Sequence, residues 1–324
     1  MNSERAARSF QKIFNEVMAN VERVVRGKQD QVALALTCIF AEGHLLLEDV
    51  PGTGKTTLAK AIAASFEGDM SRVQFTPDML PSDVTGGQIY NQSAGTFEPY
   101  LGPIFANVVL ADEINRASPK TQAAMLEVME ERQVTIGNDT LEVPRPFVVI
   151  ATQNPVEQEG TYHLPEAQLD RFLMRTSLGY PSDDDTVEVL KGNAAGINAE
   201  SLEPVASIAQ IAKMIEWARS VHLDESIYTY IVKLVAATRP PDAPGIRLGA
   251  SPRGAIAMMR AAQVIAAAQG RDFVDVQDVK RVASPVLAHR LILTPEAELR
   301  RVRSEDLVEE FLASVELPSM VRAN

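Results

Sequence analysis

Cysteine, tryptophan and long apolar runs are scarce in this 324-residue chain. Its one cysteine, Cys38, excludes an internal disulfide and a cysteine-based zinc cluster. Because no 18 consecutive residues are apolar, the sequence predicts no transmembrane helix. Residues 1–11 are polar and of mixed charge, so they do not look like a secretory signal peptide. We therefore expect a protein of the cytoplasm.

Positive charge is also in short supply, since 31 Lys and Arg face 43 Asp and Glu and give a net charge of −12. Such a chain is a poor match for a phosphate backbone, so nucleic acid is not the expected partner. Hydrophobic residues at 46% and charged residues at 23% indicate a globular protein and exclude a disordered chain or a coiled coil. The length is about twice that of a typical domain and predicts two domains.

The first half of the chain alternates apolar runs with helical periodicity. Residues 44–48 form an apolar run that leads into a glycine-rich segment and then into helical spacing. Continuous apolar runs bounded by polar turns are typical of a parallel sheet that is covered on both faces. This alternation predicts a doubly wound α/β domain. The other expected elements are helices over residues 4–23, 29–41, 56–66 and 119–131, strands over 108–111 and 147–151, and β-hairpins over 88–98 and 132–143.

Beyond residue 181 the composition changes to Ala-rich helical stretches, and strand signals disappear. Ser251 and Thr294, each followed by proline, mark helix starts. A run of three aspartates near the boundary suits a helix N-terminus better than a metal site. We therefore predict an α/β nucleotide-binding core with its N-terminal helices over residues 1–183, and a smaller all-α domain over residues 184–324.

The segment VPGTGKTT, residues 50–57, has the pattern of a phosphate-binding loop. Glycines, which have no Cβ, let successive backbone N–H groups converge on phosphate oxygens. Lys55 then supplies a charge for the β- and γ-phosphates, Thr56 an oxygen for Mg²⁺, and the following helix its positive end. The general pattern has a glycine where this chain has Asp49, so we expect an altered turn or a weaker nucleotide affinity. The predicted nucleotide-binding residues of the loop are Pro51, Gly52, Thr53, Gly54, Lys55, Thr56 and Thr57.

Two carboxylates end the apolar run in VVLADEINR, residues 108–116. In P-loop enzymes the first such acid holds Mg²⁺, and a neighbouring acid polarises the attacking water. Asp112 is the candidate for the first role and Glu113 for the second. Open α/β sheets bind ligands at the carboxyl ends of their strands, where this pair is expected to lie. Thr56 and Asp112 are therefore the candidate metal ligands, and the predicted cofactors are ATP and Mg²⁺.

Three further polar residues are candidates for contact with the γ-phosphate or the attacking water. Asn154, in ATQNP, would orient the water beside Glu113, although a turn before Pro155 explains this asparagine equally well on its own. Arg171 and Arg253 are the candidate γ-phosphate arginines. Arg253 lies in the first turn of a predicted helix, where the dipole disfavours a cation, so a ligand-facing role is favoured.

Four segments of the chain resemble the MoxR family of AAA+ ATPases. LLLEDVPGTGKTTLA is similar to the Walker A region of that family, and VVLADEINRASPKTQAAMLEVMEERQVT to its Walker B strand and following helix. FVVIATQNPVEQEGTYHLPEAQLDRFL resembles the sensor 1 and arginine-finger region, and GASPRGAIAMM the sensor 2 helix. The match extends over most of the chain, and the ADEINR and ATQNP segments are far more specific than a Walker A motif alone.

The resemblance implies a role for each candidate arginine and an adenine pocket. Arg171 would reach the nucleotide of the neighbouring subunit, whereas Arg253 would act from the lid domain of its own subunit. Val25 and Gly27 resemble the segment that lines the adenine pocket. Rivals of Arg171 for the trans role are Arg116, Arg132 and Arg175.

The same resemblance implies the assembly and the activity. The family fold is a P-loop NTPase (AAA+) core with a helical lid, and residues 85–100 and 133–143 match its helix-2 and pre-sensor-1 inserts. Its members form homo-oligomeric rings, usually hexamers, that hydrolyse ATP. They carry out chaperone-like remodelling or metal-cofactor insertion on a protein client, often with a partner that carries a von Willebrand factor A domain.

Two other functions stay open at this point. A DNA or RNA motor would use a hairpin to grip a strand, but the hairpin tip at residues 137–139 has no positive charge. A nucleotide-gated scaffold would bind ATP without appreciable turnover. The four histidines show no metal-ligand spacing, so we interpret them as packing or surface residues.

Overall fold

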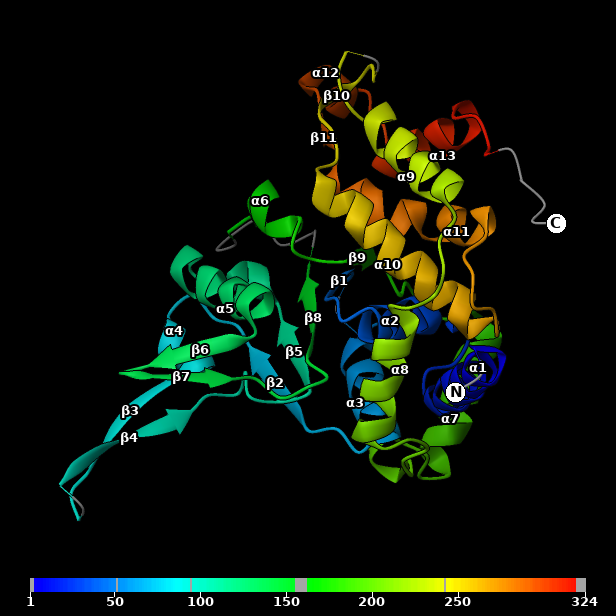
Figure 1. The fold of residues 1–324 in the computed structure, drawn as a ribbon. Helices are drawn as coiled ribbons and strands as arrows, with labels where there is room; N and C mark the ends of the chain where they lie inside the picture. Colours follow the sequence, from blue (N-terminus) through cyan, green and yellow to red (C-terminus); the bar gives the residue numbers. More distant parts are fainter. Residues whose placement is uncertain (1–2, 51, 94, 155–161, 242, 319–324) are drawn as a thin grey trace.

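A five-stranded parallel β-sheet lies at the centre of the chain (Figure 1). The structure is a computed structural model that describes residues 3–50, 52–93, 95–154, 162–241 and 243–318. The strands follow the order β2, β5, β8, β1, β9, and every neighbouring pair is parallel. Their bounds are Met70–Gln74 for β2, Val108–Asp112 for β5, Val148–Gln153 for β8, Leu45–Glu48 for β1 and Met174–Thr176 for β9. The predicted α/β class with a parallel sheet is confirmed.

Both faces of this sheet are buried, as its apolar strands predict. Along β1, Leu45 and Leu47 belong to one hydrophobic cluster and Leu46 to another, because successive side chains point to opposite faces. The first cluster includes residues of helices α1, α2 and α3, and the second includes residues of α5. These helices cover Ser3–Glu22 (α1), Gln29–Phe40 (α2), Lys55–Ser65 (α3) and Pro119–Glu131 (α5), close to the predicted ranges.

Two strands of the sheet were not predicted from the sequence. Strand β2 reads Met-Ser-Arg-Val-Gln and lies at the edge of the sheet, where Val73 is its one buried residue. Strand β9 has three residues, too few to show a period. An edge position and a short length both remove the apolar run on which strand prediction depends.

Two β-hairpins extend from the side of the sheet that faces away from α1 (Figure 1). They are β3 (Gly86–Asn91) with β4 (Thr96–Leu101), reached through the short helix α4 (Pro81–Thr85), and β6 (Gln133–Ile136) with β7 (Asp139–Glu142). Both predicted hairpins are confirmed. Strand β6 buries Val134 and Ile136, whereas every residue of β4 is exposed.

The chain after β9 is mainly helical, as predicted, but it also contains a short antiparallel ladder. Strand β10 (Ile246–Leu248) pairs with β11 (Ile292–Leu293), so the prediction that strands end at residue 181 was wrong. Pairings this short leave no periodic signal. The predicted helix starts at Ser251 and Thr294 are confirmed, because each side chain accepts a backbone hydrogen bond from the first turn. The remaining helices are α6 (Glu166–Leu169), α7 (Asp183–Ala194), α8 (Ile208–Ala218), α9 (Glu225–Ala237), α10 (Pro252–Ala268), α11 (Val276–Leu287), α12 (Pro295–Leu299) and α13 (Ser304–Ser314).

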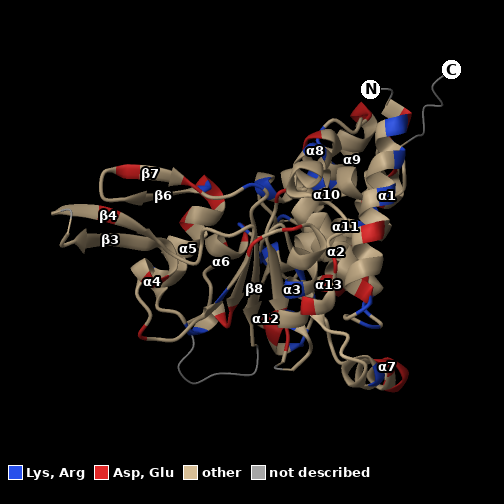
Figure 2. Cartoon of the chain, turned by 90° about the horizontal axis from the view of Figure 1, so that it is seen from below, with Lys and Arg blue, Asp and Glu red and all other residues tan. Residues whose placement is uncertain are grey.

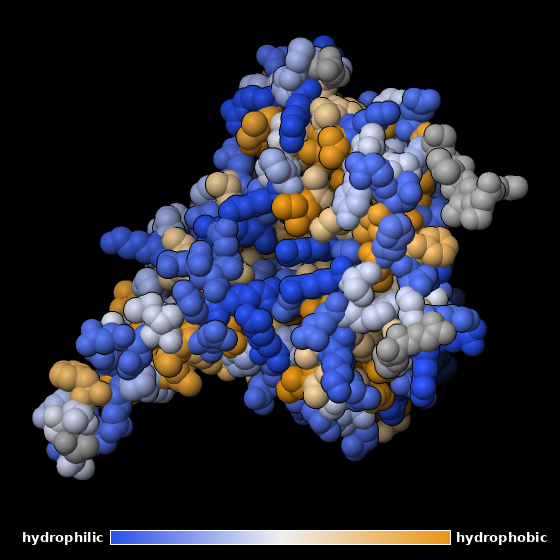
Figure 3. Space-filling model, viewed as in Figure 1, coloured by the Kyte–Doolittle hydropathy of each residue, from blue (hydrophilic) through white to orange (hydrophobic). Residues whose placement is uncertain are grey.

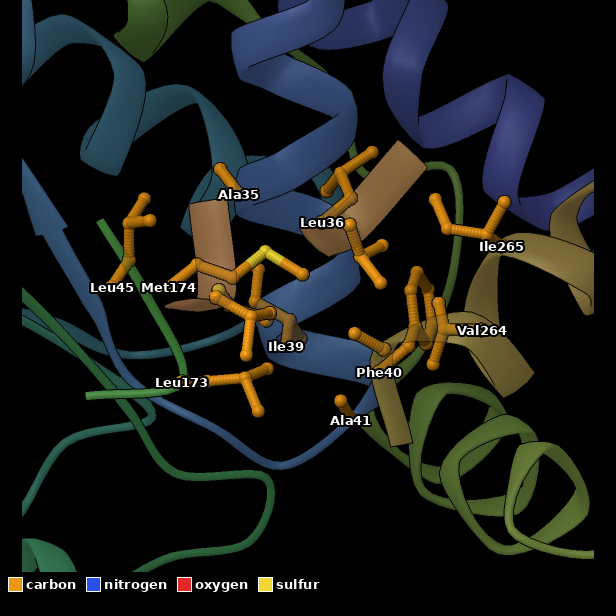
Figure 4. Close-up of a cluster of buried hydrophobic side chains, with 14 of the residues drawn as sticks. Ala35, Leu36, Ile39, Phe40, Ala41, Leu45, Leu173, Met174, Val264 and Ile265 are labelled. Atoms are coloured by element: carbon orange, nitrogen blue, oxygen red, sulfur yellow. The ribbon is translucent and has the colours of Figure 1, made fainter. Parts of the chain in front are cut away.

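The helical region shares one hydrophobic core with the α/β part. Ile39 and Phe40 of α2 lie in the same buried cluster as Val264 and Ile265 of α10, and Figure 4 shows these side chains together. The cluster continues from α1 through α10 to α13. The lid therefore packs directly on the core, and the predicted domain boundary at residue 183 stays a prediction.

The structure shows where the single cysteine lies and how the described helices compare with a membrane-spanning helix. Cys38 is buried in the shared core, and burial raises the pKa of its thiol, so this cysteine is an unreactive apolar side chain. Within the described ranges, no helix has both the length and the apolar character needed to cross a membrane.

Candidate active site

The glycine-rich segment forms an open loop between β1 and α3. Gly52 and Gly54 have φ angles of 85° and 91°, a left-handed conformation that residues with a Cβ rarely adopt. A Cβ added at either position would meet no atom within 4 Å, so the loop leaves room for a bound group. Lys55 begins α3, and its Nζ donates to two backbone carbonyls at the start of the loop, both at 3.0 Å. Thr53 is buried, and Pro51 lies outside the described residues.

Asp49, which departs from the general loop pattern, is buried, and its carboxylate connects the loop to the chain beyond β9 through hydrogen bonds. Its Oδ2 accepts from the N–H groups of Leu178 and Gly179, both at 2.8 Å, and its Oδ1 from the N–H of Val50 at 3.0 Å. Asp49 is not among the residues with a positive φ, so its backbone conformation needs no glycine. The carboxylate therefore replaces a glycine without distorting the turn and anchors the start of the loop.

Replacing Asp49 with glycine would restore the general pattern, yet we expect it to destabilise the protein. Three backbone N–H groups would lose a charged acceptor, and glycine would add entropy to the unfolded chain. We expect the free energy of unfolding to fall by about 2–4 kcal/mol in chemical denaturation. Asp49→Asn keeps one acceptor oxygen and is expected to lose less. Equal stability of the glycine variant and the natural chain would contradict this anchoring role.

Asp112 ends β5 with both carboxylate oxygens engaged. Its Oδ1 accepts from the hydroxyl of Thr152 at 2.7 Å, and its Oδ2 pairs with Arg72 at 2.7 Å. The same hydroxyl oxygen of Thr152 accepts from the N–H of Glu113 at 2.9 Å, so one side chain of β8 orients both predicted acids. Our sequence reasoning missed Arg72 and Thr152, because neither stands in the acidic motif and only strand pairing brings them to it.

Glu113 follows the strand in a left-handed conformation, with φ of 57°. Such strained residues cluster at functional sites, and this one lies where the sheet ends. Its Oε2 accepts from the side-chain amide of Gln74 at 2.8 Å and pairs with Arg116 at 3.0 Å. Gln74 is the last residue of β2, and its register partner on β5 is Asp112. The edge strand thus holds the second predicted acid in place.

The sheet brings the phosphate loop and the acids together at the carboxyl ends of its strands. The loop follows β1, Asp112 ends β5, and Asn154 follows β8, the strand between them. Neighbouring strands lie about 4.8 Å apart, so β1 and β5 are separated by about 10 Å. The carboxylate of Asp112 and the hydroxyl of Thr56 offer the oxygens that Mg²⁺ prefers, and the glycines leave space for phosphates. The residues present therefore fit a magnesium–nucleotide ligand.

A cavity of about 300 Å³ adjoins the start of α3 and is bordered by α7. Its lining residues outside α7 and residues 197–200 are Arg23, Val24, Arg26, Thr56, Thr57 and Lys60. Of the two residues predicted for an adenine pocket, Val25 is buried in the hydrophobic core. Gly27 lies against α7, where an added Cβ would be 2.0 Å from an Asp185 carboxylate oxygen. Their sequence neighbours Val24 and Arg26 line this cavity, and the adenine-pocket role of Val25 and Gly27 stays a prediction.

The two candidate arginines lie at the opposite ends of the strands, the amino ends, which we call the arginine edge. Just after Arg171, the N–H of Leu173 donates to the carbonyl of His44, which precedes β1, at 2.8 Å. Arg171 pairs with Glu130 near the end of α5 at 3.0 Å, and Arg253 pairs with the other oxygen of the same carboxylate. Strand β1 has four residues, so about 13 Å of sheet separates this edge from the phosphate loop. Because the start of α10 lies at the amino ends of the strands, the structure does not bring Arg253 to the loop of its own subunit.

A cavity of about 360 Å³, the arginine edge cavity, opens at the arginine edge and is rich in positive charge. Six arginines and three carboxylates line it. Glu42 pairs with Arg132 and Arg219, and Asp170 pairs with Arg290. In Figure 3, strongly hydrophilic side chains gather on the face between α5 and α10.

The buried guanidinium of Arg290 fixes the segment that carries Arg171. It pairs with Asp170 at 2.8 Å and donates to three backbone carbonyls in the segment that leads into β9. The other carboxylate oxygen of Asp170 accepts from the hydroxyl of Ser251 at 2.8 Å. Ser251 caps α10 immediately before the turn that carries Arg253. One network therefore positions both candidate arginines.

The three rival arginines make contacts within the subunit. Arg116 pairs with Glu113, and Arg132 pairs with Glu42 at the arginine edge. Arg175 on β9 bridges Glu48 at the end of β1 and Glu305 of α13, at 3.0 Å each. These ion pairs favour structural roles for all three.

His44, which precedes β1 and lines the arginine edge cavity, is buried and has hydrogen-bond partners for both ring nitrogens. The Nδ1 of His44 accepts from the N–H of Val149 at 2.9 Å, so its Nε2 donates to the carbonyl of Met129 at 3.0 Å. Burial lowers the pKa of His44 to about 3, so the ring is neutral at physiological pH. Among the described residues, no group of three or more potential ligands is arranged to hold a metal ion.

Comparison with known proteins assigns both parts of the chain to known families. Residues 44–174 match the ATPase family associated with various cellular activities (AAA), and residues 242–311 match the AAA lid domain. A solved structure of a protein from Cytophaga hutchinsonii superposes with a TM-score of 0.91 at 41% identity and covers 98% of each chain. The fold and its two parts are therefore those of an AAA+ protein.

Three relatives match nearly the whole chain. It is 47% identical to the uncharacterized protein YeaC of Bacillus subtilis, over 94% of this chain and 95% of that protein. It is 41% identical to chaperone MoxR1 of Mycobacterium tuberculosis, over 93% and 81%, and 33% identical to protein MoxR of Methylorubrum extorquens, over 98% and 100%. The chain therefore belongs to the MoxR family of AAA+ ATPases, and it hydrolyses ATP.

Proposed function

We propose that this chain couples Mg²⁺-dependent ATP hydrolysis to the remodelling of a protein partner, within a homo-oligomeric ring. The observation that carries the proposal is the division of the site into two halves at opposite edges of one sheet. The first half holds the phosphate loop and the acids, and the second holds Arg171 and Arg253. In a ring, the first half of one subunit meets the second half of the next, and each interface then holds a complete hydrolytic site.

In the first half, each residue has a distinct proposed role. Lys55 contacts the β- and γ-phosphates, and Thr56 and Asp112 hold Mg²⁺. Bound Mg²⁺ would neutralise charge on the phosphates. Glu113 polarises the attacking water, and Asn154 orients it from the adjacent strand end. The convergence of these residues at the carboxyl edge of the sheet supports the assignment.

In the second half, Arg171 and Arg253 are proposed to act on the nucleotide of the neighbouring subunit. An arginine supplied in trans stabilises charge on the transferred phosphoryl group and contributes about 10³–10⁵ in rate. This assignment replaces the cis role expected for Arg253, because Arg253 lies at the amino ends of the strands and the phosphate loop of its own subunit lies at their carboxyl ends. The resemblance to the MoxR family supports six subunits in the ring.

The β3–β4 hairpin is the proposed contact with the protein partner. It stands away from the body of the molecule (Figure 3), and Glu98 is the one charged residue in its strands and turn (Figure 2). The ring of Tyr90 lies 5.2 Å from the ring of Phe97. Exposed apolar side chains that gather on a projecting element favour contact with protein. At least half of the surface is exposed in Ile89, Tyr90, Phe97, Tyr100 and Leu101.

A nucleic-acid motor is disfavoured by the same hairpins. Residues 86–101 and 133–142 contain no lysine or arginine, although a strand-gripping element needs positive charge for the phosphates. The chaperone name of the Mycobacterium tuberculosis relative supports a protein client instead. From the family resemblance we further propose metal-cofactor insertion or maturation as the form of remodelling, a partner with a von Willebrand factor A domain, and action in the cytoplasm.

A carboxymethylated unfolded polypeptide, reduced α-lactalbumin, tests the remodelling proposal. We expect it to raise the steady-state rate of phosphate release severalfold, because the exposed aromatic hairpin binds unfolded chain. A variant with Tyr90→Ser and Phe97→Ser is expected to lose this stimulation and to keep the basal rate. Tyr228→Ser, which changes an exposed tyrosine on α9, serves as the control. Equal stimulation of the hairpin variant would refute the contact, and stimulation by DNA alone would favour the motor.

A further inference from the structure

We propose that Glu130 is a positioning residue that holds Arg171 and Arg253 inside the subunit and gives them up to the phosphates of a neighbouring nucleotide. The inference rests on the proposed trans role of the two arginines. Glu130 pairs through one carboxylate oxygen with Arg171 at 3.0 Å and through the other with Arg253. A carboxylate between two guanidinium groups presents the charge and the paired oxygens that a phosphate also offers. Glu130 thus occupies the place that the incoming phosphate takes.

The charge balance of the arginine edge cavity favours an incoming anion. Each of its carboxylates is already paired: Glu42 with two arginines, Asp170 with one and Glu130 with two. Six arginines against three carboxylates leave a surplus of three positive charges, in a chain whose net charge is −12. Within the described part of the chain, Arg260 has no ion-pair partner. An anion that enters this cavity therefore meets excess positive charge before any existing pair breaks.

The two arginines held by Glu130 are the exchangeable ones. The side chain of Arg253 is 51% exposed and that of Arg171 28%, whereas Arg290 in the same cavity is 3% exposed. The Nε of Arg171 is buried and has no hydrogen-bond partner among the described residues. Arg253 lies in the first turn of α10, where the helix dipole disfavours a cation. Both guanidinium groups therefore gain from an anion that is more strongly charged than Glu130.

The position of Glu130 on α5 distinguishes it from its neighbours. Glu127 and Glu131 are also exposed residues of the same helix, but neither forms an ion pair within the described ranges. Of these three nearby carboxylates on α5, only that of Glu130 forms ion pairs with the arginines among the described residues. This contrast supplies matched controls, since Glu127→Gln and Glu131→Gln remove the same charge from the same helix without breaking an ion pair of either arginine.

Glu130→Gln is expected to ease the contact between subunits. The glutamine keeps the size of the side chain but removes its charge, so the arginines no longer have to leave two ion pairs before they reach phosphate. Exposed ion pairs contribute modestly, so we expect the subunit concentration at half-maximal specific ATPase activity to fall about three- to tenfold. The maximal rate and the nucleotide affinity of the phosphate loop are expected to stay unchanged, because no residue of the first half is altered.

Phosphate release measured against subunit concentration tests this inference on the full chain. Wild type, Glu130→Gln and the two control variants are compared, and a fluorescent ATP analogue reports nucleotide affinity. A merely structural role would shift thermal unfolding and the maximal rate, whereas the proposed role shifts the concentration at half-maximal activity. In the Arg171→Ala background, where little activity is expected, subunit association followed by sedimentation is expected to respond less to Glu130→Gln, because one of the two arginines is gone.

The outcomes separate this inference from the proposed function. A half-maximal concentration for Glu130→Gln that equals the controls, or exceeds them, overturns the role of Glu130. If Arg171→Ala alone keeps the wild-type rate, the trans role itself fails, and with it the basis of the inference. If Arg171→Ala is inactive and Glu130→Gln behaves as the controls do, only the inference falls.

Discussion

Glu113→Gln is expected to abolish ATP turnover and to leave nucleotide binding intact. The amide cannot accept the proton of the attacking water, whereas the phosphate loop and Asp112 are unchanged. Loss of a general base typically lowers the rate by about 10²–10⁴-fold, so kcat should fall by that factor. Steady-state phosphate release measures kcat, and titration with a fluorescent ATP analogue measures binding.

The structure supplies a reason to expect a folded variant. Glutamine at this position keeps a side-chain oxygen that accepts from Gln74, so the contact with the edge strand survives, and the ion pair with Arg116 is lost. Glu216→Gln, which changes an exposed residue of α8, is the matched control and should keep full activity. Undiminished hydrolysis by Glu113→Gln would remove Glu113 from the catalytic role.

Arg171→Ala is expected to be inactive alone and to regain activity when it is mixed with Glu113→Gln. Each variant keeps one intact half of the site, so an interface between them combines an intact loop with an intact arginine. The single variant should lose about 10³-fold or more in kcat. In a random equal mixture, about one quarter of the head-to-tail interfaces are complete, and the rate should recover to about that fraction of wild type.

The same mixing experiment decides where Arg253 acts. If Arg253 serves the neighbouring subunit, Arg253→Ala mixed with Glu113→Gln recovers activity, but Arg253→Ala mixed with Arg171→Ala does not, because both changes damage the same half. Arg247→Ala, which removes an exposed lid arginine paired with Glu166 at 3.5 Å, is the control and should stay active. A mixture of Arg171→Ala and Glu113→Gln that stays inactive would exclude a trans role for Arg171.

Sequence reasoning was most successful where a signal is contiguous. The helix Pro119–Glu131 has the predicted bounds, because a proline start and a 3.6-residue period are local features. The glycines at positions 52 and 54 have the left-handed backbone that the loop pattern implies. Asp112 ends a buried strand and Glu113 follows it directly, as the apolar run before them indicates.

Sequence reasoning failed where partners are distant in the chain. Arg72 and Thr152 contact Asp112 from 40 residues away on either side, and no local pattern marks them. The acceptor role of Asp49 was not predicted, because two of its donors lie beyond residue 177 in a segment without a motif. Val25, predicted to line an adenine pocket, is buried in the core, and its role stays a prediction.

The sequence by itself determined the chemistry that is available: a loop of backbone amides, a lysine, a pair of carboxylates and two arginines, each within a short motif. Only the tertiary structure decided which of these groups share one ligand. Strands that run parallel carry the loop and the acids to their carboxyl ends, whereas the start of α10 and the segment before β9 lie at the amino ends. The length of a strand therefore separates the arginines from the phosphate loop of the same subunit, and we propose that a second subunit brings them together.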